Sequence, residues 1–458
     1  MADPPLTLSN IPYDCHREIL RHLDLQALKN LRLTSRQMKD LCSGPVFNGF
    51  LKRQTIDMSR ESLESLCRIA CYEEFWGVVQ ELRVCVPLYD TACVIRMITM
   101  QQDVTPQDYN FVACREAVQN RFFDASALEL LTSALKQLAR LEMIDVDLIV
   151  VTGLGPRIST ETRWWDWGEN VDKGSEICRI IMSAIARSGI SLEALRIFPD
   201  TPVCSVPLYD LESTTDNLKK GGYKMVPAEV KKFGIKIASR SLSDATIAFG
   251  DLRDSDPPDR GVRRFVNLLE QIPNLEELQL NIFNTLDNNF GSRKILRAIV
   301  SRIHWPHLRR CTIGGIYTEE PSLVKFLTTH PHLESLDMES FVMVSGAWQP
   351  VFKVLSEDMP VLKYLRLSNL LQNTRSSMRS REVNLFPCWE EQTQKVKDEY
   401  CEQDQAVPGP YSLWVHTREF DAEDLQRGLE FWPIAAQTFS PRPRALTSGE
   451  KYGYLYPI

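Results

Sequence analysis

Apolar residues recur along this chain at two spacings, and each spacing predicts a different kind of element. Between residues 8 and 41 they come three or four positions apart in short groups, which predicts three short amphipathic helices. From about residue 79, short apolar strings alternate with longer stretches of helical spacing. That alternation predicts an α/β fold with strands and helices in turn.

Local capping signals support the three N-terminal helices. Pro12 suits a first helical turn, where its missing N–H costs nothing. Asp24 is a good N-cap for the second helix. Thr34 followed by Gln37 makes a capping box for the third.

A unit of about forty residues cannot cover much apolar surface by itself, yet this segment is rich in Ile and Leu. We therefore interpret it as a binding site for another protein. Two alternatives are a helical cap on the rest of the chain and a helix-turn-helix that reads DNA. A DNA reader needs a basic face, whereas the chain carries a formal net charge of −7.

The same segment resembles the F-box family in the order and spacing of its residues. The family pattern is a Leu-Pro pair followed by an acid, Leu-rich stretches, an aliphatic pair and Ser-Arg before a bulky residue. Met38 stands where the family often has Trp, and Cys15 and His16 stand where aliphatic residues are common. The resemblance covers roughly a tenth of the chain. It implies binding to the Skp-type adaptor of a Skp–cullin–F-box ubiquitin ligase. The residues it assigns to adaptor binding are Ile11, Pro12, Ile19, Leu20, Leu23, Leu25, Leu28, Leu31, Leu33 and Met38.

A repeat occupies the middle of the chain. Strings of the form Pro-x-Leu-x-x-(Leu/Cys)-x-aliphatic begin at Pro273, Pro306, Pro331 and Pro360, with spacings of 33, 25 and 29 residues. Each of the first three precedes a helical pattern, and a strand followed by a helix at this period predicts a leucine-rich-repeat solenoid. The alternative is an α/β domain with ordinary βαβ crossovers.

Looser strings lie upstream, and the whole repeat region resembles the degenerate, helix-containing leucine-rich repeats found behind F-boxes, especially in fungal proteins. These strings are Val79…Leu82…Val84, Leu138…Leu141…Met143, Leu192…Leu195…Ile197 and Leu242…Ala245…Ile247. The predicted organisation is an F-box at 1–50, a helical linker at 51–78, repeats at 79–370 with insertions at about 153–175 and 199–230, and a C-terminal cap with a partly disordered tail at 371–458.

Side chains alternate along a strand, so each repeat string presents some residues to the core and others to an outer, concave face. A mixed-charge face with Tyr and Arg suits protein recognition, although an ordinary solvated face is the alternative for any one residue. Clustered tryptophans in the first insertion could also anchor a partner, or fold back onto the repeats. The candidate client-binding residues are Glu277, Gln279, Arg310, Asp337, Tyr364, Arg366, Trp164 and Trp165.

The composition indicates the cellular compartment of the protein and bears on whether it binds a metal or a cofactor. The 12 cysteines are scattered without a C-x-x-C, which favours free thiols in a reducing compartment. No signal-peptide pattern and no apolar run of about 20 residues is present, so we expect a cytoplasmic or nuclear protein without a membrane partner. The pairs His304/His307 and His330/His332 fall at one turn of the repeat, where a surface location explains them. We expect no metal and no cofactor.

The chain has no complete catalytic motif, so we predict a non-catalytic receptor subunit. By family implication it would reach cullin and RING subunits through the adaptor and would hold a protein client, with no nucleic-acid partner. One alternative is an F-box scaffold that acts outside a cullin ligase. Another is a hydrolase that uses Cys67 or Cys71.

Overall fold

The computed structural model divides the chain into two compact units. The first holds residues 1–166, 176–198 and 222–227, and the second holds 167–175, 199–221 and 228–458. The structure describes residues 11–73, 75–99, 104–123, 125–151, 153, 167–199, 201, 204–223, 226–238, 259–283, 290–368, 370–373, 380–382 and 417–420.

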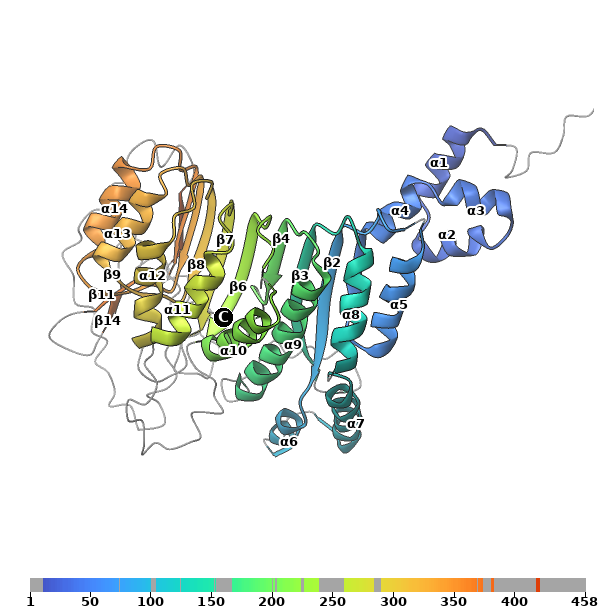
Figure 1. Cartoon of the computed structure of the whole chain (residues 1–458), viewed down its shortest axis with the longest axis horizontal. Coiled ribbons are helices and arrows are strands. Elements are labelled where there is room, and N and C mark those ends of the chain that lie inside the picture. Colours follow the sequence, from blue (N-terminus) through green and yellow to red (C-terminus); the bar gives the residue numbers. More distant parts are fainter. Residues whose placement is uncertain are drawn as a thin grey trace, which may run out of the picture. The chain divides into compact units, whose positions relative to one another are not determined.

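The first unit begins with helices and continues into a parallel sheet in the order β1-β2-β3-β4, of which Figure 1 labels β2, β3 and β4. Helix α5 packs on α8, and α6 packs on α7. Its helices are α1 (Tyr13–Arg21), α2 (Leu25–Arg32), α3 (Arg36–Cys42), α4 (Pro45–Lys52), α5 (Arg60–Cys71), α6 (Thr91–Thr99), α7 (Pro106–Phe122), α8 (Ala125–Gln137) and α9 (Trp167–Ser188), whose first residues fall in the second unit. Its strands are β1 (Arg53–Ile56), β2 (Glu81–Tyr89), β3 (Met143–Val151) and β4 (Ala194–Ile197).

The strand register of the first unit corrects one of the looser strings. Leu82 of β2 pairs with Ile144 of β3, which pairs with Leu195 of β4. The string in β3 that is equivalent to Val79…Leu82…Val84 is therefore Leu141…Ile144…Val146. The predicted string, Leu138…Leu141…Met143, was wrong by three residues. Its error has a physical cause: Leu138 and Leu141 are both buried in the turn before the strand, so they mimic the pattern.

In the second unit, β6, β7, β8, β10 and β12 form a parallel sheet, with β5 parallel to β6 and β15 antiparallel to β12. Short strands β9, β11 and β13 make a second parallel ladder, and β14 is antiparallel to β13. Helices α11, α12, α13 and α14 pack in succession (Figure 1). The strands are β5 (Val206–Pro207), β6 (Lys232–Ala238), β7 (Glu277–Phe283), β8 (Arg310–Gly314), β9 (Tyr317–Glu319), β10 (Ser335–Glu339), β11 (Val342–Ser345), β12 (Tyr364–Ser368), β13 (Leu371–Asn373), β14 (Ser380–Glu382) and β15 (Thr417–Phe420). The helices are α10 (Leu208–Lys220), α11 (Asp259–Leu269), α12 (Phe290–Arg302), α13 (Glu320–Thr329) and α14 (Trp348–Glu357).

The repeat strings occupy equivalent positions on neighbouring strands. Leu278 of β7 pairs with Cys311 of β8, which pairs with Leu336 of β10, and Leu336 pairs with Leu365 of β12. All four side chains are buried, and the residues on either side of them are more exposed, as the alternation predicted. The repeat read from the sequence is therefore one layer of side chains in the core of this sheet.

Three segments differ from the organisation that the sequence predicted. Strand β6 carries a repeat string that pattern reading missed, Val230…Phe233…Ile235, whereas residues 242–247 lie outside the described part. The second insertion, 199–230, contains β5 and α10. The segment 51–78, predicted to be helical, contains strand β1 as well as helix α5.

One of these four histidines, His330, is not on the surface as predicted, whereas His304, His307 and His332 are exposed. His330 is only 2% exposed, with its ring against those of Trp305 and Phe326. Its Nδ1 lies 2.8 Å from the carbonyl oxygen of Phe326, which can only accept, so Nδ1 donates and Nε2 is left to accept from the Trp305 N–H at 3.4 Å. Burial lowers the pKa of His330, which favours this neutral form. No helix among the described residues is long and apolar enough to cross a membrane.

Candidate functional site

The N-terminal helices form a small core of their own. Leu20, Leu28, Cys42, Phe47 and Leu51 are buried together, which joins α1, α2, α3 and α4. The predicted cap of the second helix is confirmed, because the Asp24 carboxylate accepts the Ala27 N–H at 2.7 Å. The third helix is capped by Ser35, whose hydroxyl accepts the Met38 N–H, and the predicted capping box at Thr34 was wrong. The Thr34 hydroxyl instead donates to the Leu31 carbonyl at 2.7 Å.

The structure separates the residues assigned to adaptor binding into three groups. Leu20, Leu28 and Met38 are buried within the helical segment itself. Ile19 is 41% exposed and Leu33 is 85% exposed, and Pro12 is exposed as well. The remaining four are half-buried: Ile11, Leu23, Leu25 and Leu31. The exposed and half-buried residues can contact a partner directly, whereas the buried ones support the helices that carry them.

His16 is a polar residue in an apolar place. It is buried in α1, and its Nε2 contacts no hydrogen-bond partner among the described residues. A buried polar atom without a partner costs about 1–3 kcal/mol of stability. This position is one of those where the F-box pattern usually has an aliphatic residue.

We expect His16→Leu to stabilise helix α1 by about 1–2 kcal/mol, because it replaces an unsatisfied ring nitrogen with a side chain suited to the apolar core. Hydrogen exchange of the α1 backbone amides measures the change. His22→Leu is the matched control: the His22 side chain is 78% exposed and pairs at the surface with Glu18 at 3.6 Å, so exchange should change little. If the α1 amides of His16→Leu exchanged as fast as those of the unaltered chain, or faster, the buried His16 nitrogen would not be destabilising.

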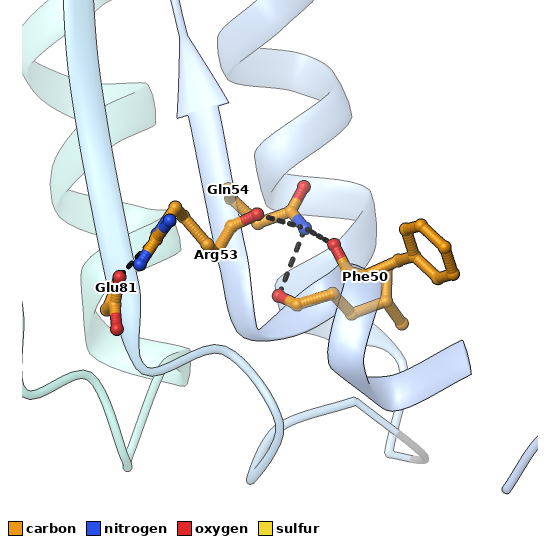
Figure 2. Close-up of polar contacts among 5 residues, drawn as sticks. Phe50, Arg53, Gln54 and Glu81 are labelled. Atoms are coloured by element: carbon orange, nitrogen blue, oxygen red, sulfur yellow. Dashed lines mark hydrogen bonds and ion pairs between the residues drawn. The ribbon is translucent and has the colours of Figure 1, made fainter. Parts of the chain in front are cut away.

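The helical segment passes into the sheet of the first unit without an intervening loop. Helix α4 ends at Lys52 and strand β1 begins at Arg53. The Gln54 amide donates to the carbonyl oxygens of Phe50 and Leu51 at 3.4 and 3.0 Å, and Arg53 pairs with Glu81 of β2 at 2.5 Å. Figure 2 shows the contact of Gln54 with Phe50 and the pair formed by Arg53 and Glu81. These contacts fix the last turn of α4 to the first two strands.

The turn after α5 strengthens this junction. Phe75 and Val78 are partly buried against the core of the N-terminal helices, and the rings of Phe75 and Phe47 lie 6.1 Å apart. Two separate stretches of the first unit, β1 and the turn that carries Phe75 and Val78, therefore contact the N-terminal helices. The sequence predicted only a helical linker here, since pattern reading does not show which side chains return to an earlier core.

Six of the eight candidate client-binding residues lie on the outer side of the second unit's sheet, where several pair across strands. Glu277 of β7 pairs with Arg310 of β8 at 3.1 Å, and Asp337 of β10 pairs with Arg366 of β12 at 3.0 Å. Gln279 is half-buried in the row of Asp337, and Tyr364 is exposed at the start of β12. Trp164 and Trp165 lie outside the described residues.

A second row of charges was missed because its members occupy variable positions of the repeat string. We call it the rim ladder, since each residue directly precedes a strand of the sheet. The charges alternate in sign along it. The rim ladder consists of Lys231, Glu276, Arg309, Glu334 and Lys363.

The described residues contain no group of three or more His, Cys, Asp or Glu side chains that could hold a metal ion. Burial raises the pKa of the Cys67 thiol, and its Sγ lies 3.4 Å from the Leu130 carbonyl oxygen. A raised pKa disfavours the nucleophilic thiolate, which weakens the hydrolase alternative at Cys67.

Comparison with known families agrees with the N-terminal geometry. Residues 8–48 match the F-box domain. No curated protein matches the chain as a relative. The chain thus has an F-box domain at its N-terminus, followed by an α/β region with parallel strands, and the F-box domain indicates an adaptor role in ubiquitin ligase complexes.

Proposed function

We propose that this chain is the substrate-recognition subunit of a Skp–cullin–F-box ubiquitin ligase. Its F-box docks the Skp-type adaptor, and the outer side of its repeat strands holds a protein client. Cullin and RING subunits join through the adaptor. The chain itself contributes proximity, because it raises the effective concentration of the client at the site of ubiquitin transfer.

The observation that carries this proposal is an F-box domain with large apolar side chains on its outside. Ile19 and Leu33 are exposed, although the segment has a closed core of its own. Burying one such side chain contributes about 1.5–3 kcal/mol before entropy losses. Together with the half-buried leucines, they supply enough apolar area in scale for a stable adaptor complex.

The proposed domain organisation follows the predicted boundaries, with degenerate leucine-rich repeats at 79–370 and a C-terminal cap from 371. Support for the repeats comes from the shared register of their strings on parallel strands. Support for the cap comes from β14 and β15, which add antiparallel strands to β13 and β12. Phe420 of β15 is buried, as a capping residue should be.

The junction between the F-box and the first sheet fits the same role. A receptor places its client usefully only if its adaptor-binding part is held firmly to the rest of the chain. The Arg53–Glu81 pair and the contacts of Phe75 supply that hold within the first unit. No flexible linker separates α4 from β1.

Affinity purification of the intact chain from its native host tests the proposal. We expect the Skp-type adaptor and cullin to copurify with it in comparable amounts. Adaptor without cullin would favour the alternative, an F-box scaffold that acts outside a cullin ligase. Absence of both would contradict the proposed function.

A further inference from the structure

The rim ladder of the second unit is held together by its backbone. The Glu276 N–H donates to the Lys231 carbonyl at 2.7 Å, and the Arg309 N–H donates to the Glu276 carbonyl at 2.9 Å. The Glu334 N–H donates to the Arg309 carbonyl and the Lys363 N–H to the Glu334 carbonyl in the same way. The spacing of these five side chains is thus set by the sheet and does not depend on a mobile loop.

The charges of the rim ladder do not cancel. Its five residues carry three positive and two negative charges, which leaves one positive charge in excess. Glu334 is shared between Arg309 at 3.3 Å and Lys363 at 2.7 Å. The hydrogen bond from Lys363 lowers the pKa of Glu334, so this carboxylate stays ionised and occupied at neutral pH. Both cations are about two-thirds exposed and remain within reach of a partner.

A cavity of about 370 Å³ opens beside Arg309 and Glu334, and we call it the rim cavity. Arg309 and Glu334 line it with His307 and His332, which occupy the same position in successive repeat strings, and Pro306 and Val361 add apolar wall. Each imidazole donates a hydrogen bond even when it is neutral. The cavity lining therefore combines the Arg309 guanidinium, paired with the Glu334 carboxylate, with two imidazole rings and a small apolar surface.

We propose that the rim cavity binds a carboxylate side chain from an acidic segment of the client protein. This inference rests on the proposed function, since the client supplies the segment. Arg309 and Lys363 share the one carboxylate of Glu334, which leaves one positive charge in excess beside the cavity. One carboxylate of the client matches that charge, whereas a phosphate dianion exceeds it. The apolar wall receives the methylenes of the acidic side chain, and Arg309 binds its oxygens.

The inference is tested by binding of a fluorescein-labelled oligoglutamate peptide to the intact chain, purified together with its adaptor and followed by fluorescence anisotropy. Arg309→Gln is expected to weaken binding about threefold or more, because it removes the guanidinium. Glu334→Gln is expected to tighten binding by a similar factor, since it frees both cations from their present partner. Misfolding is expected to lower specific binding, so a gain of affinity makes this variant the decisive one.

Lys353→Gln is the matched control, because it removes one exposed positive charge from helix α14 and should leave peptide binding unchanged. Equal weakening by Lys353→Gln, or no gain in Glu334→Gln, would overturn the inference. Binding of a phosphoserine peptide in place of oligoglutamate would overturn the carboxylate assignment. Adaptor copurification is scored in the same preparation: its loss contradicts the proposed function, whereas failure of peptide binding alone contradicts only this inference.

Discussion

Replacing both Ile19 and Leu33 with aspartate is expected to abolish copurification of the Skp-type adaptor. Each change removes an exposed apolar side chain worth about 1.5–3 kcal/mol on burial and places a charge in the interface. Affinity should therefore fall about a hundredfold or more, which a quantitative pull-down detects easily. The F-box helices should stay folded, because neither side chain belongs to the buried core.

Two further variants make that result interpretable. Ile95→Asp with Val118→Asp changes two exposed apolar residues of α6 and α7 in the same chemical way and should leave adaptor binding intact. Leu20→Asp would also lose the adaptor, but by placing a carboxylate inside the helical core, so it cannot identify a contact. Retention of the adaptor by the Ile19/Leu33 variant would contradict the proposed docking surface.

Gly315→Ala is expected to destabilise the second unit by about 3 kcal/mol or more. Gly315 has φ of +68°, and a Cβ added there would lie 1.9 Å from the carbonyl oxygen of Ile282. The carbonyl oxygen belongs to the backbone of β7, and a Cβ is fixed to its own backbone, so the clash cannot be relieved by turning a side chain. Hydrogen exchange of the β7 and β8 amides measures the loss.

Gly189→Ala separates the backbone strain of a positive φ from the steric clash with Ile282. Gly189 has φ of +69°, but nothing lies within 4 Å of an added Cβ, so only the backbone strain of about 1–2 kcal/mol remains. Ser340 is the next residue after β10, as Gly315 is after β8, and has φ of +54°. Ser340→Gly should therefore stabilise its turn slightly. Equal losses in Gly315→Ala and Gly189→Ala would show that the close approach of Ile282 is unimportant.

The local sequence pattern was most informative where the spacing of apolar residues and the residues next to them predict the same element. The four Pro-x-Leu strings predicted strands β7, β8, β10 and β12, and the register confirms that they are equivalent. Pattern was least informative where a short apolar run has no unique register. Leu138 and Leu141 fit the string as well as the true residues of β3, since both are buried. The period alone cannot distinguish them, because hydrogen bonds to β2 and β4 set the register.

The sequence by itself determined that the chain begins with an F-box and continues into strands that alternate with helices. The F-box follows from the resemblance of residues 8–41 to the family pattern. The alternation of strands and helices follows from the short-range spacing of apolar residues, which reports how one helix or strand buries its own face. Only the tertiary structure decided which F-box leucines form the core and which face outward, and that α4 is joined directly to β1. It also brought Lys231, Glu276, Arg309, Glu334 and Lys363 into one row. Successive members of this row lie 25 to 45 positions apart in the sequence, so strand pairing brings them together and no local pattern reveals it.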